Sequence, residues 1–330
     1  MNLIRNDCLA VLASLIVMSG LPVQAATPGE WLAGMNRAFA ELTYDGIFSY
    51  FTGSDLASLR VVHMIVDGQQ RERLVHLNGA PREIVRTGDE VACILAPGDE
   101  LLELGESIPS GPFARAFVRR FDQIGGHYTL SFSGQDRVAG RVARRIAVRP
   151  RDEHRYGYRL WLDEENSLLL RSELLNEKGE RLEIFQFTTI MFGERVSERD
   201  LQSEESGSSM VTHLTLAREL REPVAQREVR WHARWVPAGF TMAAADVRRT
   251  PATLKAVNTM MYSDGVAAFS IFVEDMPEKG AAAMVSRDGA TVAVTHMVNG
   301  PPEDALVTLV GEVPESTARR IAESIYFRAQ

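Results

Sequence analysis

Short runs of alternating apolar and polar residues, separated by turn residues, fill most of the sequence between 44 and 192. In "LRVVHMIVDGQQRERLVHL" (59–77), two such runs flank Asp67-Gly68, a dipeptide that favours a tight hairpin turn. "REIVRTGDEVACIL" (82–95) has the same form around Gly88-Asp89. Hairpins at this spacing predict a first unit built on a twisted antiparallel sheet or a partly closed barrel.

Two helices are expected beside these strands. The first begins with a capping box formed by Thr27 and Glu30, with Pro28 at the first helical position. Its apolar residues lie on one face and are Trp31, Met35, Phe39 and Leu42. A second helix is predicted between Pro112 and Ile124, where phenylalanines are spaced by four. We expect a helix to cover the concave side of the sheet, which would otherwise expose apolar side chains to water.

The sequence divides into four regions. Arg5, the apolar run "CLAVLASLIVM" and the small residues Val23 and Ala25 predict a signal peptide over 1–25, with a membrane anchor as the alternative. The large domain is expected over 26–196. A polar, Ser/Glu-rich stretch then predicts a linker over 197–221. Residues 222–330 predict a smaller α+β domain of four to six antiparallel strands and a C-terminal helix.

Composition and motifs argue for a binding protein. A net charge of −8 disfavours nucleic acid as a partner, because phosphate binding needs a basic surface. No nucleophile elbow, zinc-protease motif or phosphate loop is present, and the seven histidines lack metal-ligand spacing. We therefore predict no catalytic residues, no metal and no cofactor.

The acidic cluster Asp163–Glu165 lies where the apolar alternation stops. Two interpretations are open, a convergent acid site and a solvent-exposed turn. Because adjacent strand residues point to opposite faces, three consecutive acids do not converge easily on one substrate. We therefore expect a turn between two strands.

Arginine is concentrated just before this turn. The sequence has eight arginines from Arg137 to Arg159. One interpretation is a solvated strand face; the other is a patch for an anionic partner, either phosphorylated lipid head groups or an acidic peptide. For the second interpretation the candidates are Arg144, Arg145 and Arg149.

Aromatic residues supply a second candidate site. Most are expected to be ordinary core, but an unclosed sheet beside a helix also makes an apolar cavity able to take acyl chains. The candidates for lining this cavity are Phe48, Tyr50, Phe113, Phe117, Tyr158 and Leu160.

Several stretches resemble the MucB/RseB family of periplasmic regulators of sigma-E-type factors. The resemblance rests on "YDGIFSY" (44–50), "RYGYRLWLDEENSLLLRSELLNEKGERLEIFQFTTIMFG" (155–193), "WVPAGF" (235–240), "MMYSDGVAAFSIFVE" (260–274), "GATVAVTHMV" (289–298) and "VGEVPESTARRIAESI" (310–325). It implies a large domain similar to the lipoprotein carriers of the Lol system, an unclosed antiparallel β-barrel with helices over its open side, followed by a smaller α+β domain.

The same resemblance implies a periplasmic negative regulator of the envelope stress response. Family members bind the periplasmic domain of a membrane-spanning anti-sigma factor and hinder its site-1 protease, and lipids or lipopolysaccharide are proposed to release them. The family offers no catalytic residues to carry over. Our hypothesis is that the arginine candidates attract anionic head groups while the aromatic candidates meet acyl chains.

A periplasmic lipid or lipoprotein carrier is the alternative function, because a Lol-like barrel alone would suggest it. The second domain argues against pure carriage, since a shuttle needs only the cavity. An envelope enzyme ranks third, for want of a convergent set of reactive groups. Whether the free protein forms a homodimer is left open by the sequence.

Overall fold

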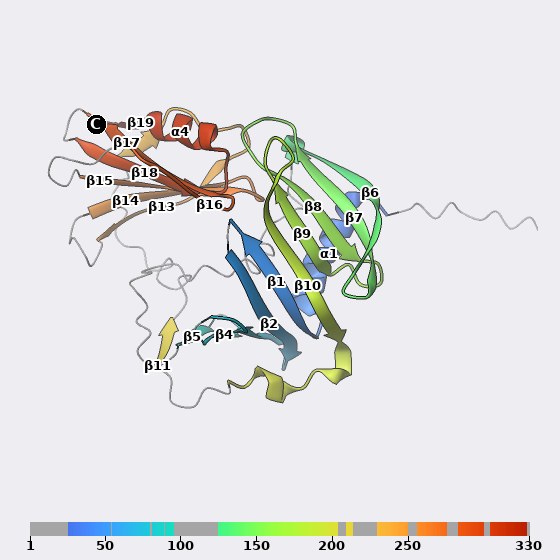
Figure 1. The fold of residues 1–330 in the computed structure, drawn as a ribbon. Coiled ribbons are helices and arrows are strands. Elements are labelled where there is room, and N and C mark those ends of the chain that lie inside the picture. Colours follow the sequence, from blue (N-terminus) through green and yellow to red (C-terminus); the bar gives the residue numbers. More distant parts are fainter. Residues whose placement is uncertain are drawn as a thin grey trace, which may run out of the picture.

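The computed structural model describes residues 26–53, 55–79, 81–88, 90–95, 125–203, 209–213, 230–249, 256–275, 283–299 and 304–328. The predicted signal peptide and the predicted helix between 112 and 124 lie outside these residues. Phe113 and Phe117 therefore receive no structural description. Figure 1 shows two units, a large curved sheet with a helix beside it and a smaller sheet with its own helix.

The large unit is one antiparallel sheet. Within the described residues its eleven strands have the order β11-β5-β4-β3-β2-β1-β10-β9-β8-β7-β6, and its two ends, β11 and β6, do not pair. The strands are β1 (Tyr44–Thr52), β2 (Asp55–Val66), β3 (Gln69–His76), β4 (Arg82–Thr87), β5 (Glu90–Leu95), β6 (Tyr128–Val138), β7 (Arg141–Pro150), β8 (Gly157–Asp163), β9 (Leu169–Leu175), β10 (Arg181–Phe192) and β11 (Ser209–His213). A short 3-10 turn, η2 (Gly125–His127), precedes β6. The predicted unclosed antiparallel barrel is confirmed.

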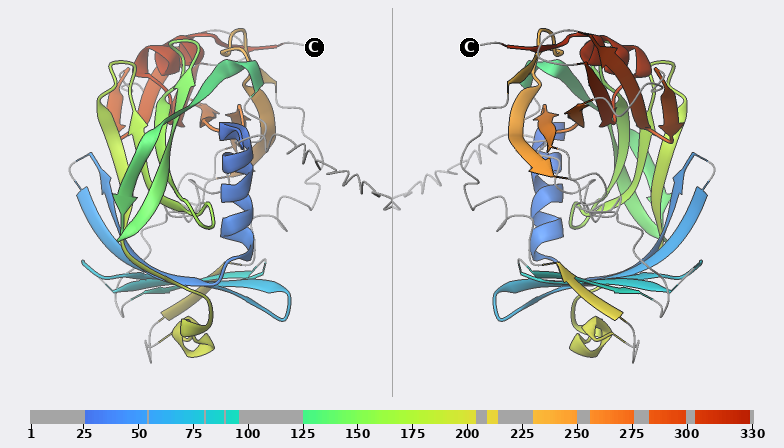
Figure 2. Two further views of the ribbon diagram at one scale, coloured as in Figure 1. Left: turned by 90° about the vertical axis from the view of Figure 1, so that its right-hand side faces the viewer. Right: turned by 90° about the vertical axis from the view of Figure 1, so that its left-hand side faces the viewer.

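Helix α1 (Pro28–Glu41) stands inside the curve of this sheet, as Figure 2 shows from two sides. The predicted capping box is present: the Thr27 side chain accepts a hydrogen bond from the Glu30 amide, and the Glu30 carboxylate accepts one from the Thr27 amide. The helix buries Leu32, Met35 and Phe39 against the sheet. We call the side of the large sheet that faces α1 the concave face and the opposite side the outer face.

The chain after β10 lies against the outer face. It forms two short 3-10 turns, η3 (Gly193–Arg195) and η4 (Glu198–Leu201). Asp200 accepts a hydrogen bond of 2.8 Å from Arg60 through its carboxylate and one of 3.2 Å from Arg73 through its carbonyl. The predicted linker over 197–221 thus begins with residues held by the large sheet and includes β11, which pairs with β5. Its polar residues here serve capping and ion pairs rather than solvation alone.

The small unit is the predicted α+β domain with a C-terminal helix. Within the described residues, six strands have the order β13-β14-β15-β18-β17-β16, and β12 pairs separately with β19. Helix α4 (Glu315–Glu323) buries Ala318, Ile321 and Ala322 in the core of this unit. The strands are β12 (Trp231–Ala233), β13 (Thr241–Arg249), β14 (Ala256–Ser263), β15 (Ala268–Asp275), β16 (Val285–Asp288), β17 (Thr291–Val298), β18 (Ala305–Gly311) and β19 (Ile325–Phe327).

Candidate functional site

The aromatic candidates that the structure describes lie on the concave face. Phe48 is completely buried, with its ring centroid 4.9 Å from that of Phe185. Tyr158 and Leu160 are also buried in the same core. These three side chains therefore form the wall of the sheet, and Tyr50 is the half-buried member of the set.

Tyr50 differs from the other candidates because its hydroxyl has a fixed partner. It donates a hydrogen bond of 2.7 Å to the Glu183 carboxylate. Burial raises the pKa of Tyr50, and the negative charge of Glu183 raises it further. The hydroxyl therefore remains a proton donor throughout the physiological pH range.

The structure does not bring the three arginine candidates together. Arg144 lies on the concave face, where its guanidinium is 5.2 Å from the Trp31 ring and 2.6 Å from the Glu164 carboxylate. Arg145 and Arg149 project from the outer face, because strand side chains alternate. An amphiphile on the concave face would therefore have access to Arg144 and not to the other two. The separation follows from the period of two along β7.

The acidic cluster forms the expected turn between β8 and β9, but one of its members is not exposed as predicted. Asp163 is completely buried. Its carboxylate accepts hydrogen bonds from the amide of Glu165 at 2.9 Å and from the Arg141 guanidinium. Glu164 and Glu165 in turn pair with Arg144 and Arg141 at 2.6 Å each. The acids thus neutralise part of the arginine run that precedes them in the sequence.

A groove of about 700 Å³ lies on the outer face. Arg145, Arg149 and Arg159 line it, together with the turn that joins β9 to β10. Arg145 donates through Nε to the Ser133 carbonyl at 2.9 Å. Arg149 is exposed, and no hydrogen bond or ion pair joins its side chain to another described residue.

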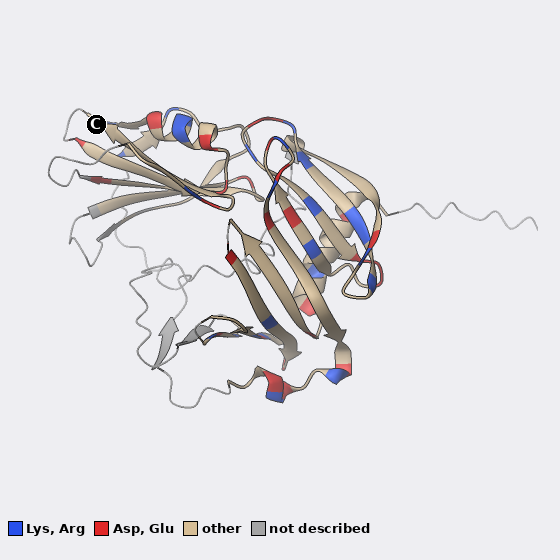
Figure 3. Cartoon of the chain, in the orientation of Figure 1, with Lys and Arg blue, Asp and Glu red and all other residues tan. Residues whose placement is uncertain are grey.

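One buried carboxylate, that of Glu173, pairs with three arginines, and Arg159 among them also lines the groove. Glu173 is 2% exposed, and its oxygens lie 2.5 Å from Arg171, 3.0 Å from Arg159 and 3.7 Å from Arg181. Figure 3 shows blue basic and red acidic segments close together on neighbouring strands of the large sheet. Paired arginines of this kind are anchored rather than free, because each guanidinium has a fixed acceptor.

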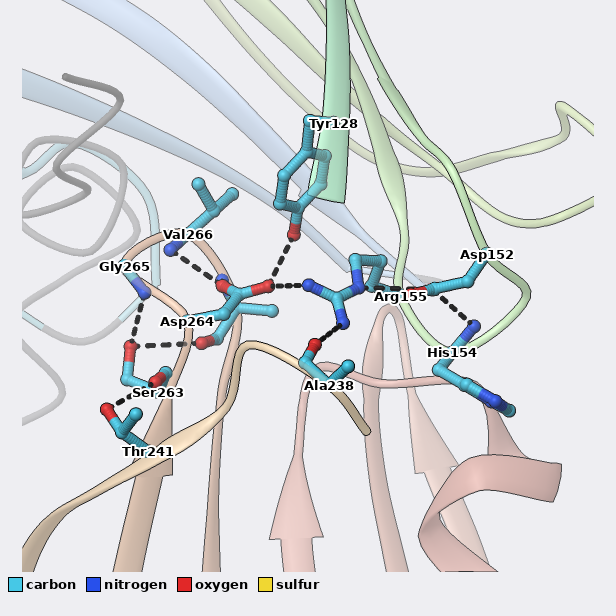
Figure 4. A network of polar contacts seen from close by, with 11 residues as sticks. Tyr128, Asp152, His154, Arg155, Ala238, Thr241, Ser263, Asp264, Gly265 and Val266 are labelled. Atoms are coloured by element: carbon cyan, nitrogen blue, oxygen red, sulfur yellow. Dashed lines mark hydrogen bonds and ion pairs between the residues drawn. The ribbon is translucent and has the colours of Figure 1, made fainter. Parts of the chain in front are cut away.

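The strongest polar cluster lies where the two units meet (Figure 4). Arg155, in the loop between β7 and β8, has a fully buried side chain, and its Nη1 is 2.6 Å from the Asp264 carboxylate of the small unit. Its Nη2 donates to the Ala238 carbonyl at 2.6 Å, and its Nε donates to Asp152 at 3.1 Å. Tyr128 donates to the same Asp264 oxygen at 2.9 Å. One arginine thus joins groups from both units.

Burial determines both the protonation of the Tyr128 hydroxyl and the cost of breaking the Arg155–Asp264 pair. Burial raises the pKa of Tyr128, and the Asp264 charge raises it further, so the hydroxyl stays protonated and donates. Asp264 also accepts from the amides of Val266 at 2.9 Å and Ala267 at 2.7 Å, which fixes its turn. A buried ion pair with this many hydrogen bonds is costly to break, because either partner alone would be an uncompensated charge.

Further contacts extend this interface. The Tyr156 hydroxyl donates to the Val313 carbonyl at 3.0 Å. In the turn between β16 and β17, the Ala290 amide donates to Glu183 at 3.1 Å, the same carboxylate that holds Tyr50. Gly289, with φ of 55°, lies so close to Thr52 that a side chain at this position would overlap it. These contacts fix the turn of the small unit against the end of β1.

Sequence reasoning did not find this interface. Arg155 was one of eight arginines in a run, and nothing local distinguishes it from Arg151 or Arg149. Its partner Asp264 lies 109 residues away. The available indication was the Asp264-Gly265 turn between two strand-like runs, which predicts a hairpin but no partner.

The described residues contain neither a membrane-spanning helix nor a cluster suited to a metal ion. No helix among them has the length and apolar character needed to cross a membrane. In the same residues, no three His, Cys, Asp or Glu side chains gather in a way suited to a metal ion.

Comparisons with known proteins agree along most of the chain. The family model of the MucB/RseB N-terminal domain matches residues 27–205, and that of the C-terminal domain matches residues 225–326. The sigma factor AlgU regulatory protein MucB of Pseudomonas aeruginosa is 36% identical over 323 residues, which cover 97% of this chain and 96% of that protein. The sigma-E factor regulatory protein RseB of Escherichia coli K12 is 31% identical over 311 residues, covering 92% and 93%.

Solved structures show the same relationship. The crystal structure of MucB in complex with MucA(peri) has a TM-score of 0.75 at 34% identity and covers 92% of this chain and all of that one. A crystal structure of MucB has a TM-score of 0.62 at 31% identity, covering 91% and 98%. With both family domains matched in order and relatives above 30% identity over nearly their full length, this chain belongs to the MucB/RseB family.

Proposed function

We propose that this protein is a periplasmic negative regulator of a sigma-E-type envelope stress response. It binds the periplasmic domain of a membrane-spanning anti-sigma factor and shields that domain from site-1 proteolysis. Lipid or lipopolysaccharide releases it. The observation that carries the proposal is the near full-length likeness to MucB solved with the periplasmic part of MucA, at TM-scores of 0.75 and 0.76.

The interface between the two units supports a regulatory role. A partner that contacts both units needs them in a fixed relative position, and the Arg155–Asp264 pair supplies that constraint. The TM-scores to the two MucA-bound structures also exceed the 0.62 found for MucB alone. Both observations favour a fixed arrangement of the two units that is suited to binding a partner protein.

The concave face supports the lipid part of the proposal. Its wall is aromatic and aliphatic, which suits acyl chains, and α1 covers it. A ligand releases a partner only through unequal affinity for the free and the partner-bound forms. A lipid in this space would act by favouring the free form.

A protease-protection assay tests the proposal. The purified periplasmic domain of the anti-sigma factor is incubated with site-1 protease, with and without this protein, and then with lipopolysaccharide. We expect slower cleavage with the protein and restored cleavage after the lipid is added. A second substrate of the same protease, unrelated to anti-sigma factors, is the control for general inhibition of the enzyme.

Unchanged cleavage of the anti-sigma domain would remove the regulatory proposal. Extraction of lipoprotein from membranes by the purified protein, without any protection, would instead identify a lipid or lipoprotein carrier. Fractionation of cells, with recovery in the periplasmic fraction, tests the location.

A further inference from the structure

The groove on the outer face has a small residue at its centre and arginines around it. On β7, Ala147 projects to this face, with Arg145 two residues before it and Arg149 two residues after it. On the neighbouring strand β8, Arg159 is paired in register with Ala147. All four residues line the groove. The short alanine side chain therefore leaves room on the sheet surface between three guanidinium groups.

Each of these arginines has N–H donors left for a ligand. Arg145 donates from Nε to the Ser133 carbonyl at 2.9 Å, and Arg159 Nη1 lies 3.0 Å from the Glu173 carboxylate. A guanidinium has five N–H donors, so these contacts position both groups without using every donor. The side chain of Arg149 is exposed and has no such contact with a described residue, and the strands beside it, β6 and β8, are described along their whole length.

The centre of the groove is positively charged. Glu173 neutralises Arg159 only in part, because Arg171 and Arg181 share the same carboxylate. Arg145 contacts a neutral carbonyl rather than an acid. An anionic group above Ala147 would therefore gain charge-assisted hydrogen bonds from guanidinium groups whose charge is not already balanced.

Acidic side chains line the rim of the same groove. Glu153 in the loop between β7 and β8 and Glu177 in the turn between β9 and β10 are both exposed. Asp152 also lines the groove, but its carboxylate already accepts a hydrogen bond of 3.1 Å from Arg155. A ligand with a negative group in its middle and a positive group beside it would match both the centre and the rim.

A polypeptide segment fits this groove better than a lipid head group does. The apolar residues that line the groove are all buried or half-buried, and they are Ala147, Val148, Pro150, Tyr158 and Leu175. They offer no exposed wall to a hydrocarbon chain, and the apolar wall of the sheet lies on its concave face. Glu153 and Glu177 would repel a head group that carries several phosphates. A peptide can instead place an acidic residue at the centre and a basic residue at the rim.

The groove borders the contact between the two units. Its loop between β7 and β8 carries Arg155, whose pair with Asp264 joins the large unit to the small one. In the same loop, His154 Nδ1 lies 3.2 Å from Thr317 Oγ1 of α4. Figure 4 shows Asp152, His154 and Arg155 together in this loop, beside the small unit. A chain that leaves the groove over the loop therefore reaches the small unit.

We propose that an acidic residue of an extended polypeptide segment binds between Arg145, Arg149 and Arg159 in this groove. A basic residue of the same segment lies beside it, at Glu153 or Glu177. The inference rests on the proposed function, because the segment is assigned to the periplasmic domain of the anti-sigma factor. It places that partner on the outer face and the lipid on the concave face, so the lipid releases the partner through the protein rather than by direct competition.

Titration calorimetry of the purified anti-sigma periplasmic domain against this protein tests the proposal. Arg149→Glu is expected to weaken binding by about tenfold or more, because a charge-assisted hydrogen bond is replaced by a repulsion, and Arg149→Gln is expected to weaken it less. Arg195→Glu is the matched control. It makes the same change in net charge at an exposed residue of η3 that does not line the groove, and it should bind as the original protein does.

A charge exchange identifies the acidic residue that is bound. Acidic residues of the anti-sigma domain are replaced by lysine one at a time, and each variant is titrated against Arg149→Glu. One replacement is expected to restore about tenfold in affinity, because opposite charges again face each other. If no replacement restores affinity, the assignment of an acidic residue to this groove is wrong.

Equal affinity of Arg149→Glu and the original protein would overturn the groove as the partner site and leave the proposed function standing. Absence of binding by the original protein would remove the proposed function and this site together. Unchanged partner binding combined with weaker release by lipopolysaccharide would refute the peptide and show that the groove takes a lipid head group.

Discussion

Arg155 and Arg149 lie six residues apart in the same arginine-rich run, yet their surroundings are opposite. Arg155 is fully buried and contacts both units, whereas Arg149 is exposed on the outer face. Arg159 is intermediate, sharing the buried Glu173 with two other arginines. The difference shows that local density of charge in a sequence does not define one surface. Strand alternation and loop position assign each side chain a separate role.

Breaking the buried pair should have the largest effect. Arg155→Met keeps most of the side-chain volume but leaves Asp264 as an uncompensated buried charge. We expect a loss of about 3–5 kcal/mol in the free energy of unfolding, measured by urea denaturation with tryptophan fluorescence. Asp264→Asn keeps an acceptor for the Val266 and Ala267 amides, and it should lower the free energy of unfolding by a similar amount.

The double variant Arg155→Met/Asp264→Asn is the control for this effect. Because no charge is then left unpaired, it should lose clearly less than the sum of the two single variants. A strictly additive result would mean that the two groups do not depend on each other.

The shared carboxylate should give an intermediate effect. Glu173→Gln keeps the shape and one acceptor but removes the charge that Arg159, Arg171 and Arg181 share. We expect a loss of about 1–2 kcal/mol, less than at Arg155, since these guanidiniums are partly exposed to water. The same denaturation measurement applies, and a cost equal to that of Arg155→Met would erase the distinction between the two sites.

Arg149→Gln should be nearly neutral. An exposed side chain without a partner among the described residues contributes within about 0.5 kcal/mol. A melting temperature measured by circular dichroism should match that of the original protein within error. A large drop in melting temperature would show that Arg149 has a structural partner and that its contrast with Arg155 is wrong.

The fold was largely accessible from the sequence because its determinants are local. Asp67-Gly68 set a hairpin, and Thr27 with Glu30 set the start of α1. The segment after β10 was harder to predict, because its polar residues suggested a free linker. Asp200 in fact binds Arg60, which is 140 residues away, and no local pattern encodes such a pairing.

The candidate sites were harder to predict, because most of their contacts join residues that are far apart in the sequence. Alternation along β7 could have separated Arg144 from Arg145 and Arg149, since adjacent strand residues face opposite ways. The Arg155–Asp264 pair could not have been found, because its two residues lie 109 positions apart in the sequence and meet only in the folded chain. Asp163 was expected in solvent, and its burial follows from Arg141, which a hairpin brings back beside the turn.

Gly289 shows how the interface between the units limits the sequence changes that a surface turn can accept. A hairpin turn at the surface usually accepts insertions and substitutions. Here the turn is closed against Thr52 and Glu183, and the space for even one methyl group is missing. A scan of single-residue insertions through the small unit should therefore find this turn as intolerant as a core strand, although it is only the connection between β16 and β17.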